Sequence, residues 1–100
     1  MYTRIVSDGC EFDWDDHNEA HLADHDISRS DAEDVLTGNH ILLEFRMDEN
    51  EQRWVAVGAT RTGRILEIVF AVRGEAIRPI TGWTADKETV ALYLKQWGLE

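Results

Sequence analysis

The second half of this chain carries four successive apolar runs with the two-residue alternation of β-strands. Short segments rich in polar residues or glycine separate the runs, at residues 48–51, 60–63 and 73–75. Connections this short join neighbouring strands that run in opposite directions. The pattern therefore predicts a four-stranded antiparallel meander, with strands over residues 40–47, 52–59, 64–72 and 76–83.

Three residue patterns predict how these strands are arranged. Residues 65–72 form the most apolar run of the chain, which favours a central strand. Pro79 has no backbone N–H to donate, so we expect its strand to lie at an edge or to be bulged there. Gly63 is expected to take a positive φ in the hairpin that precedes the third strand.

Two helices are expected before the sheet. The first covers residues 16–25, where the carboxylate of Asp15 or Asp16 can accept a free backbone N–H at the helix start. The second follows Ser28, a good N-cap residue, and ends near Gly38, which we expect in the left-handed conformation.

A last helix is expected after the sheet, with Thr84 as its N-cap and Gly98 at its end. Its apolar stripe consists of Val90, Tyr93, Leu94 and Trp97. A short strand is also predicted over residues 3–6. We therefore expect residues 1–100 to form one α+β domain with N-terminal helices, a four-stranded antiparallel meander sheet and a C-terminal helix, the helices packing largely on one face.

Charge is distributed unevenly along the chain, whose net charge is −10. Residues 1–52 hold 15 acidic and 3 basic side chains, whereas residues 53–100 hold 5 and 7. Proteins that bind nucleic acid usually have a basic surface, so any anion site here must be local and confined to the second half. The acidic half suits a basic protein partner, or it serves only to keep a small domain soluble.

The sequence also predicts a cellular compartment. Cys10 is the single cysteine, so no disulfide can form within the chain. No apolar run is long enough to cross a membrane, and the first residues lack the apolar core of a signal peptide. We therefore expect a cytoplasmic protein without membrane contacts.

Histidines recur at four-residue spacing in the first expected helix, at His17, His21 and His25. On a helix this spacing places the three imidazoles on one face, and it would suit Zn²⁺ or Ni²⁺ with Asp13 or Asp24 as a further ligand. A structural zinc site usually takes four protein ligands, however. We favour the alternative that His21 and His25 cap and pack the helix and that no metal is bound.

Several segments, taken in order, form a pattern over about residues 12–95. It begins with an opening of the form Phe-x-Trp-Asp, followed by Asn and His residues and a Ser-capped helix. The residues of the pattern are Phe12-Asp13-Trp14-Asp15, Asn18, His21, His25, Asp26-Ile27, Ser28, Arg53-Trp54-Val55-Ala56-Val57-Gly58, Gly63-Arg64-Ile65-Leu66 and Ile77-Arg78-Pro79-Ile80-Thr81-Gly82. This ordered set resembles the BrnT-type toxins of bacterial toxin–antitoxin systems.

This resemblance implies a RelE-like fold and a small endoribonuclease that needs no metal or other cofactor. It also implies a cognate ribbon-helix-helix antitoxin that binds DNA and holds the toxin inactive. RNA would then be the substrate. Trp97, on the terminal helix, suits a contact in a homodimer or with a partner.

Five residues are candidates for RNA cleavage, which needs a base for the 2′-hydroxyl and cations for the phosphate. His25 is the candidate base or acid. Arg64 and Arg78 are candidates to clamp the phosphate bidentately. Lys87 would assist at a helix N-terminus, and Tyr93 would stack a base or donate a proton. Each also has an ordinary structural explanation, as a solvated strand residue or a core side chain.

The chain departs from the family pattern where that pattern is most basic. Trp83 stands in place of an arginine, residues 89–92 lack the family's Glu/Arg-rich sequence, and Asn18 replaces a lysine. These losses predict an attenuated ribonuclease. The alternative hypothesis is a non-catalytic protein-binding module on the same fold, which would use the acidic surface or the tryptophans.

Overall fold

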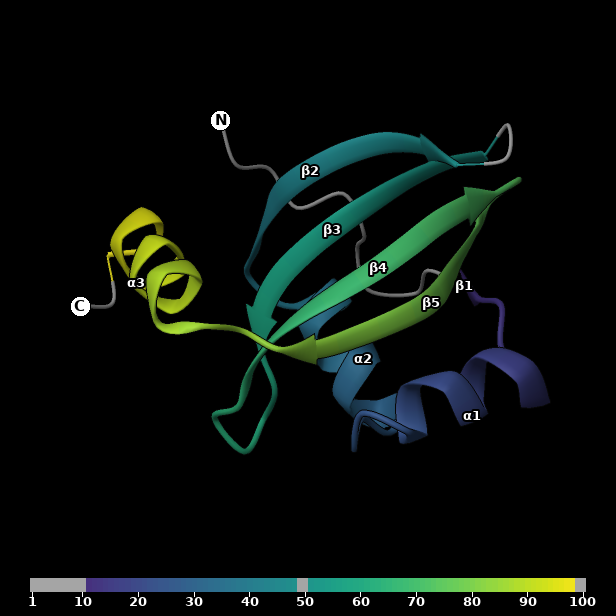
Figure 1. Ribbon diagram of the computed structural model, residues 1–100, viewed down its shortest axis with the longest axis horizontal. Helices are drawn as coiled ribbons and strands as arrows, with labels where there is room; N and C mark the ends of the chain where they lie inside the picture. The colour runs from purple at the N-terminus through teal and green to yellow at the C-terminus, as the bar shows by residue number, and fades with distance from the viewer. Residues whose placement is uncertain (1–10, 49–50, 99–100) are drawn as a thin grey trace.

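The computed structural model describes residues 11–48 and 51–98, and within them it has three helices and one five-stranded sheet (Figure 1). The strand predicted over residues 3–6 lies outside the described residues. The order across the sheet is β1-β5-β4-β3-β2. The strands are β1 (Glu11–Phe12), β2 (His40–Asp48), β3 (Glu51–Ala59), β4 (Ile65–Arg73) and β5 (Ala76–Thr84).

The α+β class is confirmed, but the sheet is mixed rather than purely antiparallel. Strands β2 to β5 form the expected meander, and the apolar strand β4 lies at its centre. β1 adds a short parallel pairing to β5, with Glu11 opposite Ala76 and Phe12 opposite Ile77. Two residues are too few to show an alternating pattern, which is why the sequence did not predict this pairing.

Pro79 lies at an irregularity in β5, as predicted. The register with β4 shifts between Val69 and Phe70, so that Phe70 pairs with Pro79 and Val69 with Thr81. On the other side of β5, the pairing with β1 stops at Ile77, before Pro79 is reached. Pro79 therefore needs no N–H for a strand neighbour there.

The first two helices begin where their caps predict. α1 (Asp16–Ala23) and α2 (Arg29–Thr37) have Asp15 and Ser28 as N-caps, each in a capping box. α1 ends earlier than the expected residue 25. The turn that follows is of the Schellman type, because Ile27 N–H bonds to the Leu22 carbonyl and Asp26 N–H to that of Ala23.

The structure departs from two of the other predicted helix ends, at Gly38 and Thr84, and confirms the one at Gly98. Gly38 is extended, with φ −89° and ψ −166°, so the left-handed conformation expected there is wrong. Thr84 is the last residue of β5, and α3 (Lys87–Gln96) is capped instead by Asp86, whose side chain accepts the Thr89 N–H. Asp86 is the better N-cap because its negative carboxylate also interacts favourably with the positive end of the helix dipole. Gly98 follows α3 with φ 67°, as expected.

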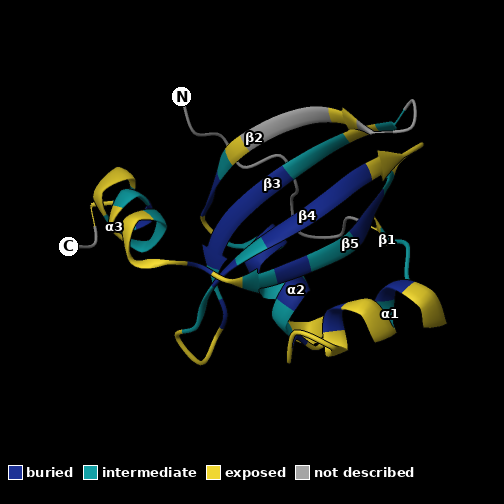
Figure 2. Ribbon diagram, viewed as in Figure 1, coloured by how far each residue is buried: buried dark blue, intermediate teal, exposed yellow. Residues whose placement is uncertain are grey.

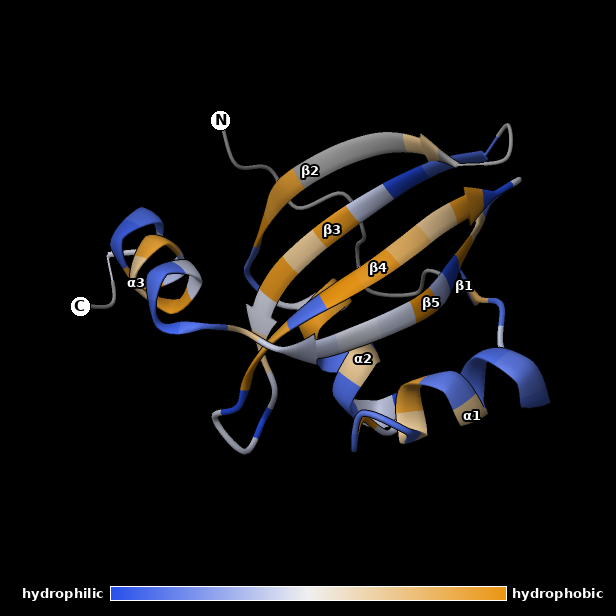
Figure 3. Ribbon diagram, viewed as in Figure 1, coloured by the Kyte–Doolittle hydropathy of each residue, from blue (hydrophilic) through white to orange (hydrophobic). Residues whose placement is uncertain are grey.

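Helices cover both faces of the sheet: two of the three pack on one face, where we expected most of the helices, and the third packs on the other. α1 and α2 pack with the larger core cluster, which includes Ala56, whereas α3 packs with the smaller cluster, which includes Val57. Successive strand residues point to opposite faces, and α3 therefore lies on the face opposite α2. Buried residues run along the middle of β3 and β4 (Figure 2), and β4 is also the most apolar of the strands (Figure 3).

Candidate functional site

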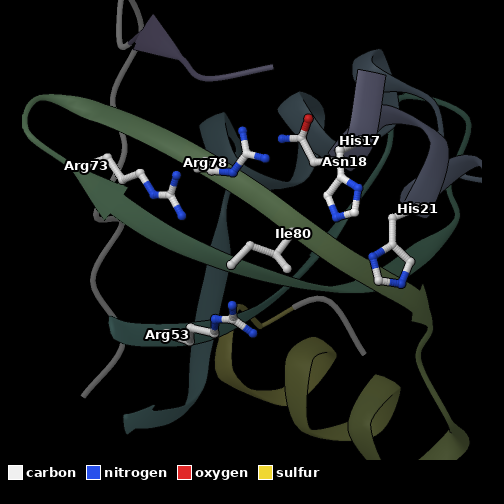
Figure 4. A pocket seen from close by; sticks show the side chains of 7 residues that line it. All are labelled: His17, Asn18, His21, Arg53, Arg73, Arg78 and Ile80. Atoms are coloured by element: carbon white, nitrogen blue, oxygen red, sulfur yellow. The ribbon is translucent and has the colours of Figure 1, made fainter. Parts of the chain in front are cut away.

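A hollow of about 180 Å³ is lined by residues of α1 and of the strands β3, β4 and β5. Its strand residues alternate with core residues: Arg53 precedes Trp54, and Arg78 follows Ile77, so both arginines point away from the larger core. Figure 4 shows the arginines extending from the strands and the histidines from α1. We call this site the arginine pocket; it is lined by His17, Asn18, His21, Arg53, Arg73, Arg78 and Ile80.

Arg78 is the most enclosed cation of the arginine pocket. Its side chain is only 10% exposed, and its guanidinium lies 3.0 Å from an Asp15 carboxylate oxygen and 3.4 Å from one of Asp13. Two ion pairs of this kind, together with the hydrogen bond that Arg78 donates to Asp15, fix a planar guanidinium in one orientation. Arg78 is therefore preorganised at the wall between α1 and β5.

Asn18 joins α1 to β5 beside this arginine. It is 2% exposed, and its amide nitrogen donates to the carbonyls of Asp13 at 2.9 Å and Pro79 at 2.7 Å. Its side-chain oxygen accepts the Asp15 N–H at 2.8 Å. The carbonyl of Pro79, which β1 does not reach, is thus bonded by a helix side chain instead.

Carboxylates balance the cations of the arginine pocket. Glu51 lies 3.0 Å from Arg73 and 3.5 Å from Arg53, and the hydrogen bond from Arg73 is the main cause that lowers the pKa of the Glu51 carboxyl. The pKa of Asp15 is also lowered, first by the Asn18 backbone N–H and then by Arg78. Both carboxylates are therefore charged at neutral pH.

Two imidazoles form the helix side of the pocket. His17 and His21 are exposed, and their ring centroids lie 6.3 Å apart with the planes tilted by 59°. Their other side lines a second hollow of about 250 Å³ together with Ala20 and Asp24. Both rings can therefore be reached by a ligand that enters the pocket.

This arrangement suits an anion with several oxygen atoms. Guanidinium groups present paired N–H donors that match the oxygens of phosphates and carboxylates. Here they come from three adjacent strands, at Arg53, Arg73 and Arg78. Among residues 11–48 and 51–98, no group of three or more His, Cys, Asp or Glu side chains could hold a metal ion.

Of the five predicted site residues, all of which are described, Arg78 alone lines the arginine pocket. Arg64 instead donates to the Asp26 carbonyl at 2.8 Å and pairs with Asp31 at 3.4 Å, next to α2. His25 is exposed in the turn after α1, which ends before it, so the three histidines do not share one helix face.

The remaining two predicted residues belong to α3. Lys87 is exposed at the first position of that helix. Tyr93 is 3% exposed and donates its hydroxyl to the Asn39 carbonyl at 3.1 Å, and burial raises its pKa. A tyrosine enclosed in this way packs α3 against the sheet and offers no free face on which an RNA base could stack.

The sequence did not predict four of the residues that line the pocket, which are Arg53, Arg73, His17 and His21. Arg53 had a visible signal, because it precedes a strand residue that packs in the core and must point the other way. Arg73 was assigned to a turn, whereas it is the last residue of β4. The histidine spacing suggests a metal site or helix packing, and neither interpretation predicts that His17 and His21 line a pocket with arginines.

The chain is similar to a known protein family. The family model of the ribonuclease toxin BrnT of type II toxin–antitoxin systems matches residues 14–88, three quarters of the chain. No curated protein matches the chain. None of the helices in the described part of the chain is long and apolar enough to cross a membrane. The resemblance seen in the sequence is thereby confirmed: the chain belongs to the family of BrnT ribonuclease toxins.

Proposed function

We propose that this protein cuts RNA without a metal ion and that the arginine pocket holds the phosphate at the point of cleavage. One observation carries the proposal: three arginines from adjacent strands and two histidines from α1 line the same small hollow. Phosphate contacts dominate the affinity of proteins for nucleic acid, and guanidinium groups are well suited to make them.

The chemistry needs cations where negative charge develops. When the 2′-hydroxyl attacks the phosphorus, the phosphorane gains charge on its oxygens, and fixed guanidinium groups stabilise it at little cost in reorganisation. Arg78 is the residue that the fold holds most firmly. Arg73, whose side chain is 51% exposed, would exchange its pair with Glu51 for the opposite side of the phosphate.

The same carboxylates that orient the arginines also attenuate the pocket. A phosphate must compete with Glu51 for Arg53 and Arg73, and with Asp15 for Arg78. We therefore propose a weaker ribonuclease than an unopposed arginine cluster would give. Roles for His25, Arg64, Lys87 and Tyr93 stay predictions, and the first three would apply to RNA that extends beyond the pocket.

Membership of a type II system implies an antitoxin partner. We propose that this partner is a ribbon-helix-helix protein and that it acts with the toxin in the cytoplasm, where the RNA is. A basic antitoxin segment would complement the acidic first half of the chain. The homodimer through Trp97 stays a prediction.

The test is cleavage of single-stranded RNA by the purified protein, with and without EDTA. Arg73→Gln and Arg78→Lys should each lower kcat/KM by about 10²-fold or more, because each removes a guanidinium from the transition state. Arg61→Gln is the matched control, since Arg61 is 91% exposed and pairs with Asp34 outside the pocket. Circular dichroism shows whether each variant is folded.

Cleavage that persists in EDTA, that falls in the two pocket variants and that is unchanged in the control supports the proposal. Cleavage abolished by EDTA contradicts it. A folded wild type that does not cut RNA favours the second candidate, a non-catalytic protein-binding module. The carboxylate partners of all three pocket arginines are the observation that favours that candidate.

A further inference from the structure

The two histidines of the arginine pocket are placed for proton transfer. We propose that His17 is the general base and His21 the general acid for cleavage of an RNA phosphodiester held by Arg78. This inference rests on the proposed function and names the groups that move its protons. Imidazole is the side chain that most readily gives and takes protons near neutral pH.

The fold holds both rings at one site. His17 and His21 are four residues apart on α1, which puts them on the same face of the helix. α1 is anchored at its N-terminus by the Asp15 capping box and to β5 by the bond between Asn18 and the Pro79 carbonyl. The two rings thus stand side by side over the strand that carries Arg78, with their centroids 6.3 Å apart.

That separation leaves room for a phosphodiester to contact both imidazoles. In an in-line displacement, the attacking and leaving oxygens lie on opposite sides of the phosphorus. A base and an acid must each come within about 2.6–3.2 Å of its own oxygen. One ring could not serve both oxygens in a single step, whereas two rings on successive helix turns can.

The proton balance of the step is complete. His17 takes the proton of the 2′-hydroxyl while the 2′-oxygen forms a bond to phosphorus. The bond between phosphorus and the 5′-oxygen breaks, and protonated His21 gives its proton to that oxygen. The products are a 2′,3′-cyclic phosphate and a 5′-hydroxyl. Arg78 stabilises the charge on the non-bridging oxygens meanwhile.

The surrounding charges favour this assignment over the reverse one. His17 lies in the first turn of α1, beside the positive end of the helix dipole. His21 lies in the last turn, near the negative end, and Asp24 lines the hollow on its outer side. On the sheet side, the pocket is lined by Arg53 on β3, Arg73 on β4 and Arg78 on β5. Glu51 pairs with Arg53 and Arg73, and Asp13 and Asp15 pair with Arg78.

The test is the pH dependence of kcat/KM on a fluorescently labelled single-stranded RNA of mixed sequence. The wild type should give a bell-shaped profile. His17→Asn should lose the acidic limb and His21→Asn the alkaline limb, each with a rate loss of about 10²–10⁴-fold. Both histidines are exposed, so these variants should fold. Arg61→Gln, which lies outside the pocket and pairs with Asp34, is the matched control and should keep both limbs.

The outcomes separate this inference from the proposed function. A wild type that does not cut RNA contradicts both. A wild type that cuts, but whose bell persists in His17→Asn and His21→Asn, contradicts the histidine assignment and leaves the arginine pocket as the phosphate site. If His17→Asn loses the alkaline limb and His21→Asn the acidic limb, the base and the acid are exchanged, which contradicts the roles proposed for the two histidines. A product ending in a 3′-phosphate that never passes through a cyclic phosphate contradicts the attack by the 2′-oxygen.

Discussion

Replacing Asn18 with alanine should destabilise this protein more than the small size of the Asn18 side chain suggests. The side chain makes three hydrogen bonds, to the carbonyls of Asp13 and Pro79 and from the N–H of Asp15. Each is worth about 0.5–1.5 kcal/mol net, and their partners would be left partly buried without water. We therefore expect the free energy of unfolding to fall by about 2–4 kcal/mol, a large share of the roughly 5–15 kcal/mol of an ordinary domain.

The assay is urea unfolding followed by tryptophan fluorescence, together with the Tm. For a domain of this size, that loss should lower the Tm by roughly 10–25 °C. Asn39→Ala is the matched control: Asn39 is exposed, and its contact with Tyr93 uses the backbone carbonyl, which alanine retains. A loss below about 1 kcal/mol for Asn18→Ala, or one equal to that of the control, would refute the claim that Asn18 fastens α1 to β5.

Three further predictions concern the backbone and the charges. Asp26 has φ 61° in the turn after α1, so Asp26→Gly should exceed Asp26→Ala in urea stability by about 1 kcal/mol, and equal stabilities would count against strain there. A Cβ at Gly82 would lie 2.6 Å from the Glu67 carbonyl oxygen, so Gly82→Ala should lower the Tm by several degrees, and an unchanged Tm in calorimetry would disprove this clash. The lowered pKa values of Asp15 and Glu51 mean that their pairs stabilise the fold above the ordinary values of 3.8 and 4.5 and that this contribution is lost as pH falls through the folded-state values. Acid titration by circular dichroism should therefore show less pH dependence in Asp15→Asn, and an identical midpoint in both proteins would contradict the pairing.

The sequence predicts local structure well where one residue decides it. Asp15 and Ser28 cap their helices because a side-chain oxygen there accepts a backbone N–H within the same few residues. Gly63 takes φ 89° for an equally local reason. The position of β4 at the centre of the sheet follows from its unbroken apolar run.

The site could not be predicted in the same way, because strand register brings it together. Arg53 and Arg73 meet only because β3 and β4 pair with Trp54 opposite Phe70, and both arginines bond to the same Glu51. The bulge at Pro79 then places Arg78 opposite Ala71, on the same face of the sheet. Arg64, next to a glycine and ahead of an apolar strand, looked equivalent in the sequence but pairs with α2.

Local sequence patterns also could not predict which face of the sheet α3 covers. Its stripe of Val90, Tyr93 and Leu94 would fit either face of the sheet equally well. The choice is made after β5, where Ala85 is buried in the smaller core cluster and its N–H bonds to the Ile65 carbonyl. That contact directs the chain toward Val57 and away from α2.

The measurement that tests this account most directly is the mapping of the RNA-binding surface of the protein. A 2′-O-methyl RNA, which lacks the attacking hydroxyl, can be titrated into ¹⁵N-labelled protein while the side-chain resonances of arginine and histidine are followed by NMR. The account predicts shifts at Arg53, Arg73 and Arg78 and at the rings of His17 and His21, with Arg61 unaffected. Shifts confined to Arg64 and Lys87, or shifts that leave Arg78 unmoved, would contradict the arginine pocket as the RNA site of this protein.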